Sequence, residues 1–414
     1  MGNRVTIYSV PGPTKSEAIL AENIPGGWQY SIENLRYLSD LNPETEFEIV
    51  FGHLNSFGLV PELPPIDRVT VHLYVFDELD LAIGNNPLPN LQHGAILNQI
   101  LRVHRLTTRS YAVLDPDCYI LMPNAFNKLL SHMSEKNLQI IGVSYPTTLP
   151  KVYYWDFPTA YFQLMIADRI HPDDLDFLPD RASFVADEVQ PGGAGLPTPK
   201  ILSRLLKLSR ISNFPIQKIL NSWRNQDRTF FVLAYSVLFN LPYRKLPLFR
   251  DTGWSNRELY KGVGFEVLPH RVDSVKLKNS IDVIEYLKSN SDVAKSGADP
   301  RWHAVMHGIP EGREIGKQPL FWSRLTELLR PKIPRPEVFP ATSIYAGISI
   351  FESISIGMDI GKMGSGYEYF WDSKPFCIHL GHGGKDDIEQ DIQRLQKLRA
   401  LVTSNSEEEE NNDK

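Results

Sequence analysis

The residues Tyr111-Ala112-Val113-Leu114-Asp115-Pro116-Asp117 carry an apolar run straight into two carboxylates. The apolar residues predict a short buried strand that ends at Asp115. At the carboxyl end of a strand in an open α/β sheet, side chains face the crevice where ligands bind. Two carboxylates there can hold a hard divalent cation, which bridges a diphosphate and neutralises its charge. Asp-Pro-Asp is also a good turn former, so a plain turn is the competing interpretation.

Strands and helices alternate on either side of this stretch, which is typical of a sheet with parallel strands. The apolar and β-branched runs predict strands at residues 5–10, 47–51, 69–75, 138–143 and 161–167. Helical spacing of apolar residues predicts helices at residues 31–38, 96–103 and 126–133. The fold class that follows is α/β.

The residues that precede the strand ending at Asp115 are also informative. Asn90-Leu91-Gln92-His93-Gly94-Ala95-Ile96-Leu97-Asn98 leads through a helix into Asp115 and Asp117. This arrangement resembles the family-2 glycosyltransferases, in which an Asn-bearing helix precedes a strand that ends in Asp-x-Asp. The resemblance implies a GT-A nucleotide-diphospho-sugar transferase fold, a Rossmann-like mixed sheet flanked by helices.

The resemblance also implies a ligand set. Asp115 and Asp117 would hold Mn²⁺ or Mg²⁺ on the diphosphate of a UDP- or GDP-sugar, and Asn98 and Asp115 would contact this donor. Asn55 follows the second expected strand, where the family usually has an aspartate that contacts the base, and Asp77 after the third strand is another candidate for contact with the base or ribose. An asparagine amide can hydrogen-bond the edge of a nucleobase.

A second match lies at Asp251-Thr252-Gly253-Trp254-Ser255-Asn256-Arg257. It resembles the family's acid followed six residues later by arginine, and it implies Asp251 as the catalytic base. The family usually has glutamate before this acid, whereas Arg250 stands here. Asp251 can equally cap a short helix that begins at Ser255, and the two roles are compatible.

A third match is Phe376-Cys377-Ile378-His379-Leu380-Gly381-His382. An apolar strand ends in histidine and opens onto a glycine-rich loop, which resembles the place where many GT-A enzymes complete the metal site. The resemblance implies His379 and His382 as metal ligands, and imidazole suits Mn²⁺ better than Mg²⁺. For acceptor contacts we expect Trp155, Asp156 and Trp254, although residues 153–156 also fit an ordinary aromatic cluster.

The composition of the chain excludes several classes of protein. The chain has 414 residues and a net charge of −6, which argues against a general nucleic-acid binder. Its two cysteines argue against a disulfide framework, and no apolar run approaches the roughly 20 residues that span a bilayer. We therefore expect a cytoplasmic protein. Residues 200–228 are basic and amphipathic, which fits either peripheral contact with an anionic membrane or a partly exposed helical hairpin.

These observations predict a GT-A catalytic domain at 1–275 with a basic helical insertion at 200–228. We expect an extension at 276–385 that completes the site, a helix at 386–403 and a disordered acidic tail at 404–414. The predicted reaction is metal-dependent transfer of a sugar from a nucleotide-sugar donor to a saccharide or lipid-linked acceptor hydroxyl, with inversion. The alternatives are a sugar-phosphate nucleotidyltransferase and a catalytically inactive glycan-binding member of the fold.

Overall fold

The computed structural model describes most of the predicted α/β region and parts of the rest. The described residues are 3–12, 26–79, 89–143, 157–178, 253, 256, 259–260, 262–271, 283–308, 311, 313, 344–345, 349–350, 367–380 and 388–412. Trp155, Asp156, Asp251, Trp254 and His382 lie outside these residues, as does the basic stretch 200–228.

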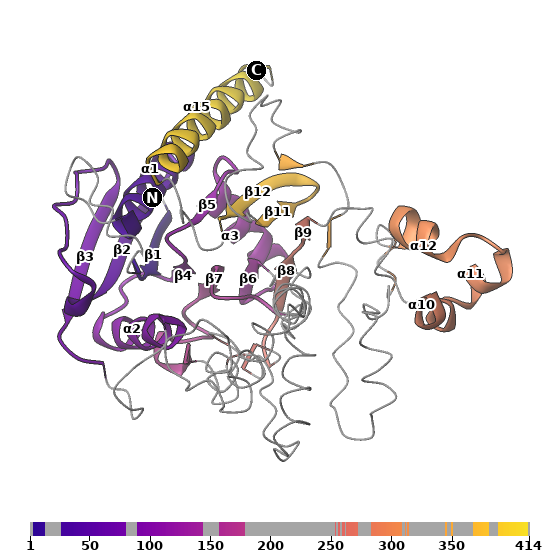
Figure 1. Cartoon of the computed structure of the whole chain (residues 1–414), viewed down its shortest axis with the longest axis horizontal. Helices are drawn as coiled ribbons and strands as arrows, with labels where there is room; N and C mark the ends of the chain where they lie inside the picture. The colour runs from indigo at the N-terminus through magenta and orange to yellow at the C-terminus, as the bar shows by residue number, and fades with distance from the viewer. Residues whose placement is uncertain are drawn as a thin grey trace, which may run out of the picture.

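A seven-stranded mixed sheet forms the centre of the fold, with the order β3-β2-β1-β4-β7-β6-β8 (Figure 1). Its strands are β1 (Asn3–Ser9), β2 (Thr45–Leu54), β3 (Val69–Phe76), β4 (Ser110–Leu114), β6 (Ile140–Val143), β7 (Phe162–Ile166) and β8 (Phe265–Leu268). The first four are parallel, whereas β7 runs antiparallel to both β4 and β6, and β8 is parallel to β6. The predicted Rossmann-like mixed sheet is confirmed.

Helices cover both faces of this sheet. Trp28, Leu35 and Leu38 of α1 (Gly26–Leu41) pack on one face, together with apolar residues of α3 (Ala125–Lys136). Ile96, Leu97 and Ile100 of α2 (Pro89–Val103) pack on the other face. The strand order reverses between β1 and β4, so the carboxyl end of β4 lies at the topological switch point, where ligands bind in such sheets.

A second sheet has the order β10-β9-β11-β12-β5. It comprises β5 (Cys118–Ile120), β9 (His270–Arg271), β10 (Ile344–Tyr345), β11 (Tyr367–Trp371) and β12 (Lys374–His379). The chain passes from the first sheet into the second between Leu114 and Cys118. Cys118 and Cys377 are buried and free, with their sulfur atoms 3.9 Å apart.

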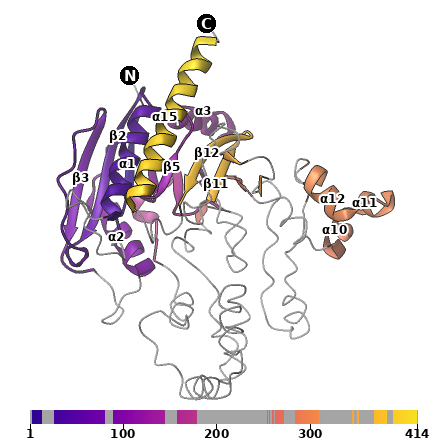
Figure 2. The same cartoon turned by 45° about the horizontal axis from the view of Figure 1, so that its top comes forward.

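The long helix α15 (Ile388–Asn412) lies along α1 in both ribbon views (Figures 1 and 2). The Tyr37 hydroxyl donates to the Leu395 carbonyl oxygen at 2.5 Å, and Arg399 Nε lies 3.0 Å from Glu33 Oε1. The expectation of a disordered tail from residue 404 is corrected, because the helix continues to Asn412. Glutamate is a good helix former, and a helix that has already nucleated propagates readily through such residues.

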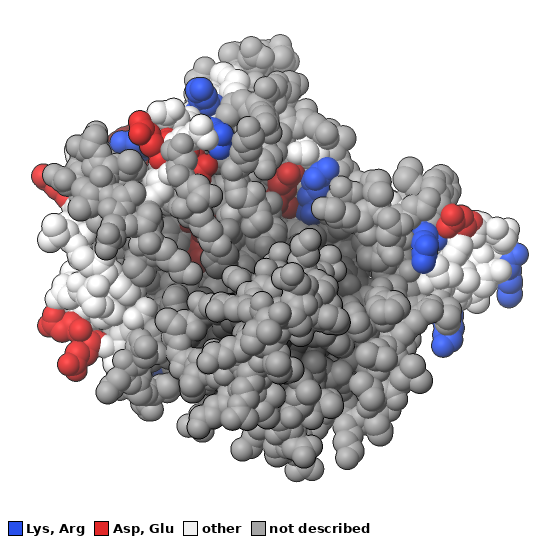
Figure 3. All heavy atoms as spheres, viewed as in Figure 1, with Lys and Arg blue, Asp and Glu red and all other residues white. Residues whose placement is uncertain are grey.

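The remaining described helices are short. They are η1 (Asn55–Phe57), η2 (Pro172–Asp174), α10 (Val283–Ser289), α11 (Ser291–Ser296), α12 (Pro300–His303) and the π-helical turn η5 (Ala304–Gly308). On the face shown in Figure 3, basic atoms gather over α10–α12, which carry Lys288, Lys295 and Arg301. None of the described helices has the length and apolar character needed to cross a bilayer.

Candidate metal centre

The Asp115-Pro116-Asp117 segment is a tight turn between the two sheets. The Cys118 amide donates to the Asp115 carbonyl oxygen at 3.0 Å, which closes a four-residue turn with proline at its second position. The Asp115 amide donates to the Tyr161 carbonyl oxygen at 3.0 Å, which ties the start of the turn to the residue before β7. The turn that the sequence allowed is therefore present, and it presents both carboxylates at the switch point.

The side chain of Asn34 in α1 hydrogen-bonds to the carbonyl groups of this turn. Its amide nitrogen lies 2.9 Å from the Cys118 carbonyl oxygen, 3.2 Å from that of Pro116 and 3.4 Å from that of Asp115. The Asn34 side chain is buried, so these carbonyl groups obtain from it a donor that water would otherwise supply. The role of Asn34 could not be predicted from the sequence, because it depends on how α1 packs against the turn.

His379 reaches the two carboxylates from the end of β12. This strand runs antiparallel to β5 and pairs His379 with Cys118, while the Leu380 amide donates to the Asp117 carbonyl oxygen at 3.0 Å. The His379 Nε2 atom lies 3.2 Å from Asp117 Oδ1 and 3.4 Å from Asp115 Oδ2. The structure thus brings together three of the residues expected to bind a metal.

These three side chains fit a divalent cation. Each offers one ligand atom, and the three atoms lie within 4.8 Å of one another. The other carboxylate oxygen of Asp115, Oδ1, is buried and has no hydrogen-bond partner among the described residues, which is costly unless a cation shares the carboxylate. Two carboxylate oxygens and one imidazole nitrogen suit Mn²⁺, whereas Mg²⁺ prefers oxygen ligands alone.

The electrostatic field between the carboxylates favours positive charge. Burial by itself would lower the pKa of His379, but the carboxylates of Asp117 and Asp115 outweigh it and raise that pKa well above its usual value. The imidazole ring also stacks on Tyr161, with ring centroids 3.7 Å apart and planes 18° apart. This stacking fixes the ring plane so that Nε2 faces the two carboxylates.

His93 is a further residue near the site that the sequence analysis did not assign. It lies in the first half of α2, and its Nε2 atom is 3.5 Å from Asp115 Oδ1. The side chain is about one quarter exposed, at 26%. It therefore approaches Asp115 on the oxygen opposite the one that faces His379.

The residues expected to bind the donor fall into two groups. The Asn55 amide donates to the Asp77 carboxylate, so the ends of β2 and β3 bring these two exposed side chains together at the same sheet edge as Asp115. The Asn98 side chain is instead buried, with its amide donating to Asp176 at 2.7 Å and accepting from the Phe177 amide at 2.7 Å. Its geometry favours a structural role, and donor contact by Asn98 stays a prediction.

Gly253 and Asn256, two described residues that follow the predicted base in the sequence, lie next to α2. The Asn256 side chain accepts from the Asp176 amide at 2.8 Å and is buried. Gly253 has a φ of +85°, and a β-carbon there would meet the Phe177 ring at 3.3 Å. Residues 253 and 256 therefore pack against residues 176–177, which hydrogen-bond to Asn98, on the α2 side of the main sheet.

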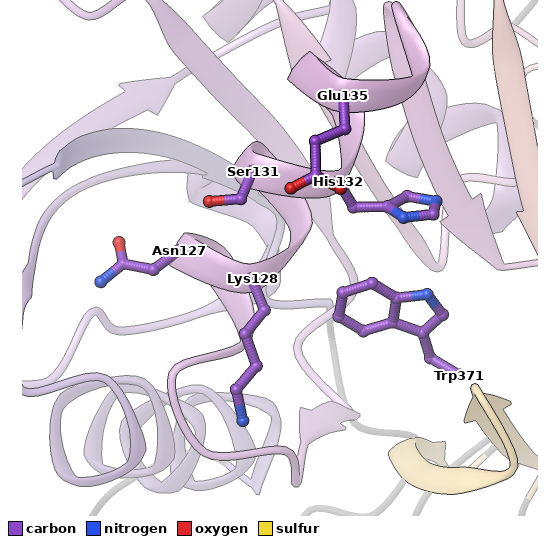
Figure 4. A pocket seen from close by; sticks show the side chains of 6 residues that line it. All are labelled: Asn127, Lys128, Ser131, His132, Glu135 and Trp371. Carbon is purple, nitrogen blue, oxygen red and sulfur yellow. The ribbon is translucent and has the colours of Figure 1, made fainter.

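A separate pocket of about 400 Å³ lies between α3 and Trp371 of β11 (Figure 4). It is lined by Asn127, Lys128, Ser131, His132, Glu135 and Trp371. No residue of the Asp115 group lines it, and two of its polar side chains are already engaged, Asn127 with Glu44 and His132 with Glu266.

Comparison with known proteins gives weak matches to solved glycosyltransferase structures. No protein-family model and no curated protein matches the chain. S. aureus TarS in complex with UDP-GlcNAc is 11% identical, with 42% of this chain and 48% of that chain covered and a TM-score of 0.25. The galactosyltransferase LgtC with donor and acceptor sugar analogues is 9% identical, with 63% and 72% covered and a TM-score of 0.28.

GlyE of Streptococcus pneumoniae TIGR4 is 11% identical, with 71% of this chain and 73% of that chain covered and a TM-score of 0.22. The match spans about half the length of the TarS structure, 48%, and 57% of a second LgtC structure, that of an active-site mutant. The function of the Asp115 group is therefore inferred from its own residues.

Proposed function

We propose that this chain is a glycosyltransferase of the GT-A type that moves a sugar from a nucleotide-sugar donor to an acceptor hydroxyl. The observation that supports this most is the convergence of Asp115, Asp117 and His379 at the switch point of the main sheet. A divalent cation held there neutralises the charge that develops on the leaving diphosphate. Mn²⁺ is the cation that the two carboxylates and the imidazole suit best.

The chain's own residues have distinct proposed roles. Asn55 and Asp77 lie together at the same sheet edge and would hold the base or ribose of a UDP- or GDP-sugar. Asp251 would take the proton of the acceptor hydroxyl, and attack from the face opposite the diphosphate would invert the anomeric centre. Trp155, Asp156 and Trp254 would contact the saccharide or lipid-linked acceptor, and His382 would be a further metal ligand.

A nucleotide-binding assay tests the metal centre directly. We expect Mn²⁺ together with UDP or GDP to raise the melting temperature of the wild-type chain, and each alone to do so less. Asp117→Asn should lose the Mn²⁺-dependent part of this shift while its melting temperature without ligand stays close to that of wild type. Asp168→Asn is the matched control, because Asp168 is an exposed acid that pairs with the exposed Arg109.

The results separate the candidate functions. An undiminished Mn²⁺-dependent shift in Asp117→Asn would place the nucleotide site elsewhere in the chain. A shift accompanied by slow release of free sugar from UDP-, GDP- or dTDP-sugars identifies a transferase and its donor. Consumption of a sugar phosphate and a nucleoside triphosphate identifies a nucleotidyltransferase, and no nucleotide response at all favours the catalytically inactive glycan-binding alternative.

A further inference from the structure

A buried carboxylate lies toward the amino ends of the parallel strands, on the face that α2 covers. Glu48 of β2 shares this face with apolar residues such as Val50 and Leu54, and it is only 4% exposed. The carboxyl end of β4, which carries Asp115, is at the other end of the sheet. A buried charge of this kind is costly unless it is paired and hydrogen-bonded.

The two oxygen atoms of Glu48 have different surroundings. Oε2 accepts hydrogen bonds from the hydroxyl groups of Thr6 at 3.0 Å and Thr107 at 3.2 Å. Oε1 faces two imidazoles, with His72 Nε2 at 3.0 Å and His104 Nε2 at 3.7 Å. These threonines fix the carboxylate, and the oxygen that they leave points between the two histidines.

A guanidinium also approaches Oε1 but adds little. Arg4 is 3.8 Å from this oxygen and is about half exposed, at 48%. An ion pair that long, with one member in solvent, contributes little to stability. The main positive partner for Glu48 must therefore lie on the side of the histidines.

The two imidazole nitrogen atoms that face Glu48 are themselves unsatisfied. His72 Nε2 and His104 Nε2 are buried and form no hydrogen bond with acceptable geometry among the described residues. The other ring nitrogen of His104, Nδ1, lies 3.2 Å from the Tyr74 hydroxyl, which fixes the ring. Burial lowers the pKa of His104, which favours the neutral imidazole that carries a free lone pair.

We propose that Glu48, His72 and His104 form a second cation site, specific for Zn²⁺ or a similar transition metal. Two imidazoles and one carboxylate are a familiar zinc ligand set, and imidazole selects such metals over Mg²⁺. Ligand atoms on a tetrahedral Zn²⁺ lie about 3.4 Å apart, given metal–ligand distances of about 2.0–2.2 Å. The separations of 3.0 Å and 3.7 Å from Glu48 Oε1 bracket this value.

The ligand atoms of Glu48, His72 and His104 are farther apart than those of Asp115, Asp117 and His379. Among the described residues, the three ligand atoms of the Asp115 group all lie within 4.8 Å of one another. His72 is the side chain that can close the Glu48 site, since it belongs to edge strand β3 and is 39% exposed. Closing the site around one ion would require a rotation of His72 that brings its Nε2 toward that of His104. Bound metal would then tie β2, β3 and the end of α2 together.

The test uses Zn²⁺ alone and the full chain in which Asp115→Asn and Asp117→Asn remove the other site. We expect this double variant, stripped of metal, to bind one equivalent of Zn²⁺ in competition with a chromophoric chelator. Zn²⁺ should also raise its melting temperature, and Co²⁺ should give the visible absorption of a tetrahedral site. Adding His72→Ala should weaken Zn²⁺ binding by roughly 100-fold or more, since loss of an outer partner alone costs about 10–100-fold.

Two further variants separate this site from nonspecific binding by histidines. Tyr74→Phe should weaken Zn²⁺ binding by about 10-fold, because it removes only the partner of His104. His132→Ala should leave binding unchanged, since His132 pairs with a single carboxylate, Glu266 Oε2 at 2.8 Å. No bound Zn²⁺ in the double variant, or equal binding after His72→Ala, would overturn the proposal. His72 is partly exposed, so its variant decides the matter even where His104→Ala does not fold.

Discussion

The hydrogen bonds from Asn34 to the carbonyl groups of the Asp-Pro-Asp turn lead to a quantitative prediction. In Asn34→Leu the side chain keeps its number of heavy atoms but loses its donor. The Asn34 amide nitrogen carries two hydrogens and faces three carbonyl oxygens at 2.9, 3.2 and 3.4 Å, so at most two good hydrogen bonds are lost. At about 1 kcal/mol for each net hydrogen bond, we expect the free energy of unfolding to fall by about 2 kcal/mol. That corresponds to roughly 4–8 °C in melting temperature for a cooperative unit of about 150–250 residues.

Metal affinity provides the second measurement on the same variant. Asn34 fixes the backbone on both sides of Asp117, so its loss should loosen the spacing of the carboxylates. Outer partners of metal ligands typically contribute about 10–100-fold in affinity, and we expect a loss of that size for Mn²⁺. Urea unfolding in the presence of a chelator gives the stability term, and titration with Mn²⁺ followed by electron paramagnetic resonance gives the affinity.

Asn42→Leu is the matched control for this prediction. Asn42 directly follows α1 and is also buried, and its side chain donates to the Leu38 carbonyl oxygen at 3.0 Å and accepts from the Phe126 amide at 3.4 Å. Its loss should cost similar stability but leave Mn²⁺ affinity unchanged. If both variants bind Mn²⁺ as tightly as wild type, Asn34 does not position the metal ligands and the reasoning is refuted.

Three further predictions follow from named contacts and residues. Tyr161→Phe should keep the stacking on His379 and bind Mn²⁺ as tightly as wild type, whereas Tyr161→Leu should bind Mn²⁺ more weakly. If the Leu and Phe variants bind Mn²⁺ equally tightly, the ring stacking does not position His379. Burial raises the pKa of Glu33 despite the nearby Arg399 and Arg36, so the folded state holds the proton of Glu33 more tightly than the unfolded chain does. The free energy of unfolding in urea should fall for wild type, relative to Glu33→Gln, as the pH rises through that raised pKa. If Glu33→Gln is instead less stable than wild type at pH 7, the ion pairs of Glu33 with Arg399 and Arg36 outweigh the cost of burying its charge. Asp251→Asn should bind nucleotide normally and lose roughly 10²–10⁴-fold in turnover, the usual share of a general base, and near-normal transfer would place the base elsewhere.

The strands that are buried on both faces were predictable from sequence. In β4 and β6 apolar residues run almost continuously, and β1 and β2 each carry a core of apolar and β-branched residues, which is typical of covered strands. The strands β5 and β11 could not be predicted this way. β5 is three residues long, and its identity as a strand depends on pairing with β12, which lies far along the chain.

Some residues of the candidate site could also be predicted from local sequence, and others could not. Asp115 and Asp117 follow from the rule that ligands bind at the carboxyl ends of strands, and this rule needs only local sequence. His379 needed the resemblance to a family, because nothing local states that β12 pairs beside β5. Asn34 and His93 lie on helices, and their approach to Asp115 follows from packing of α1 and α2 that no local pattern encodes.

The Asp-Pro-Asp turn and the proposed metal site consist of the same residues, so the two interpretations do not compete. β4 belongs to the first sheet and β5 to the second, and the Asp-Pro-Asp turn is the covalent link between them. His379 returns to this link through β12, so a cation on the three side chains would join both sheets at one point. Metal that binds only the folded chain stabilises it by RT ln(1 + [M]/Kd), about 2.7 kcal/mol at a concentration 100 times Kd. Because the ligands span the junction, bound metal should slow hydrogen exchange at β5 and β12, including at amides there that exchange through local opening.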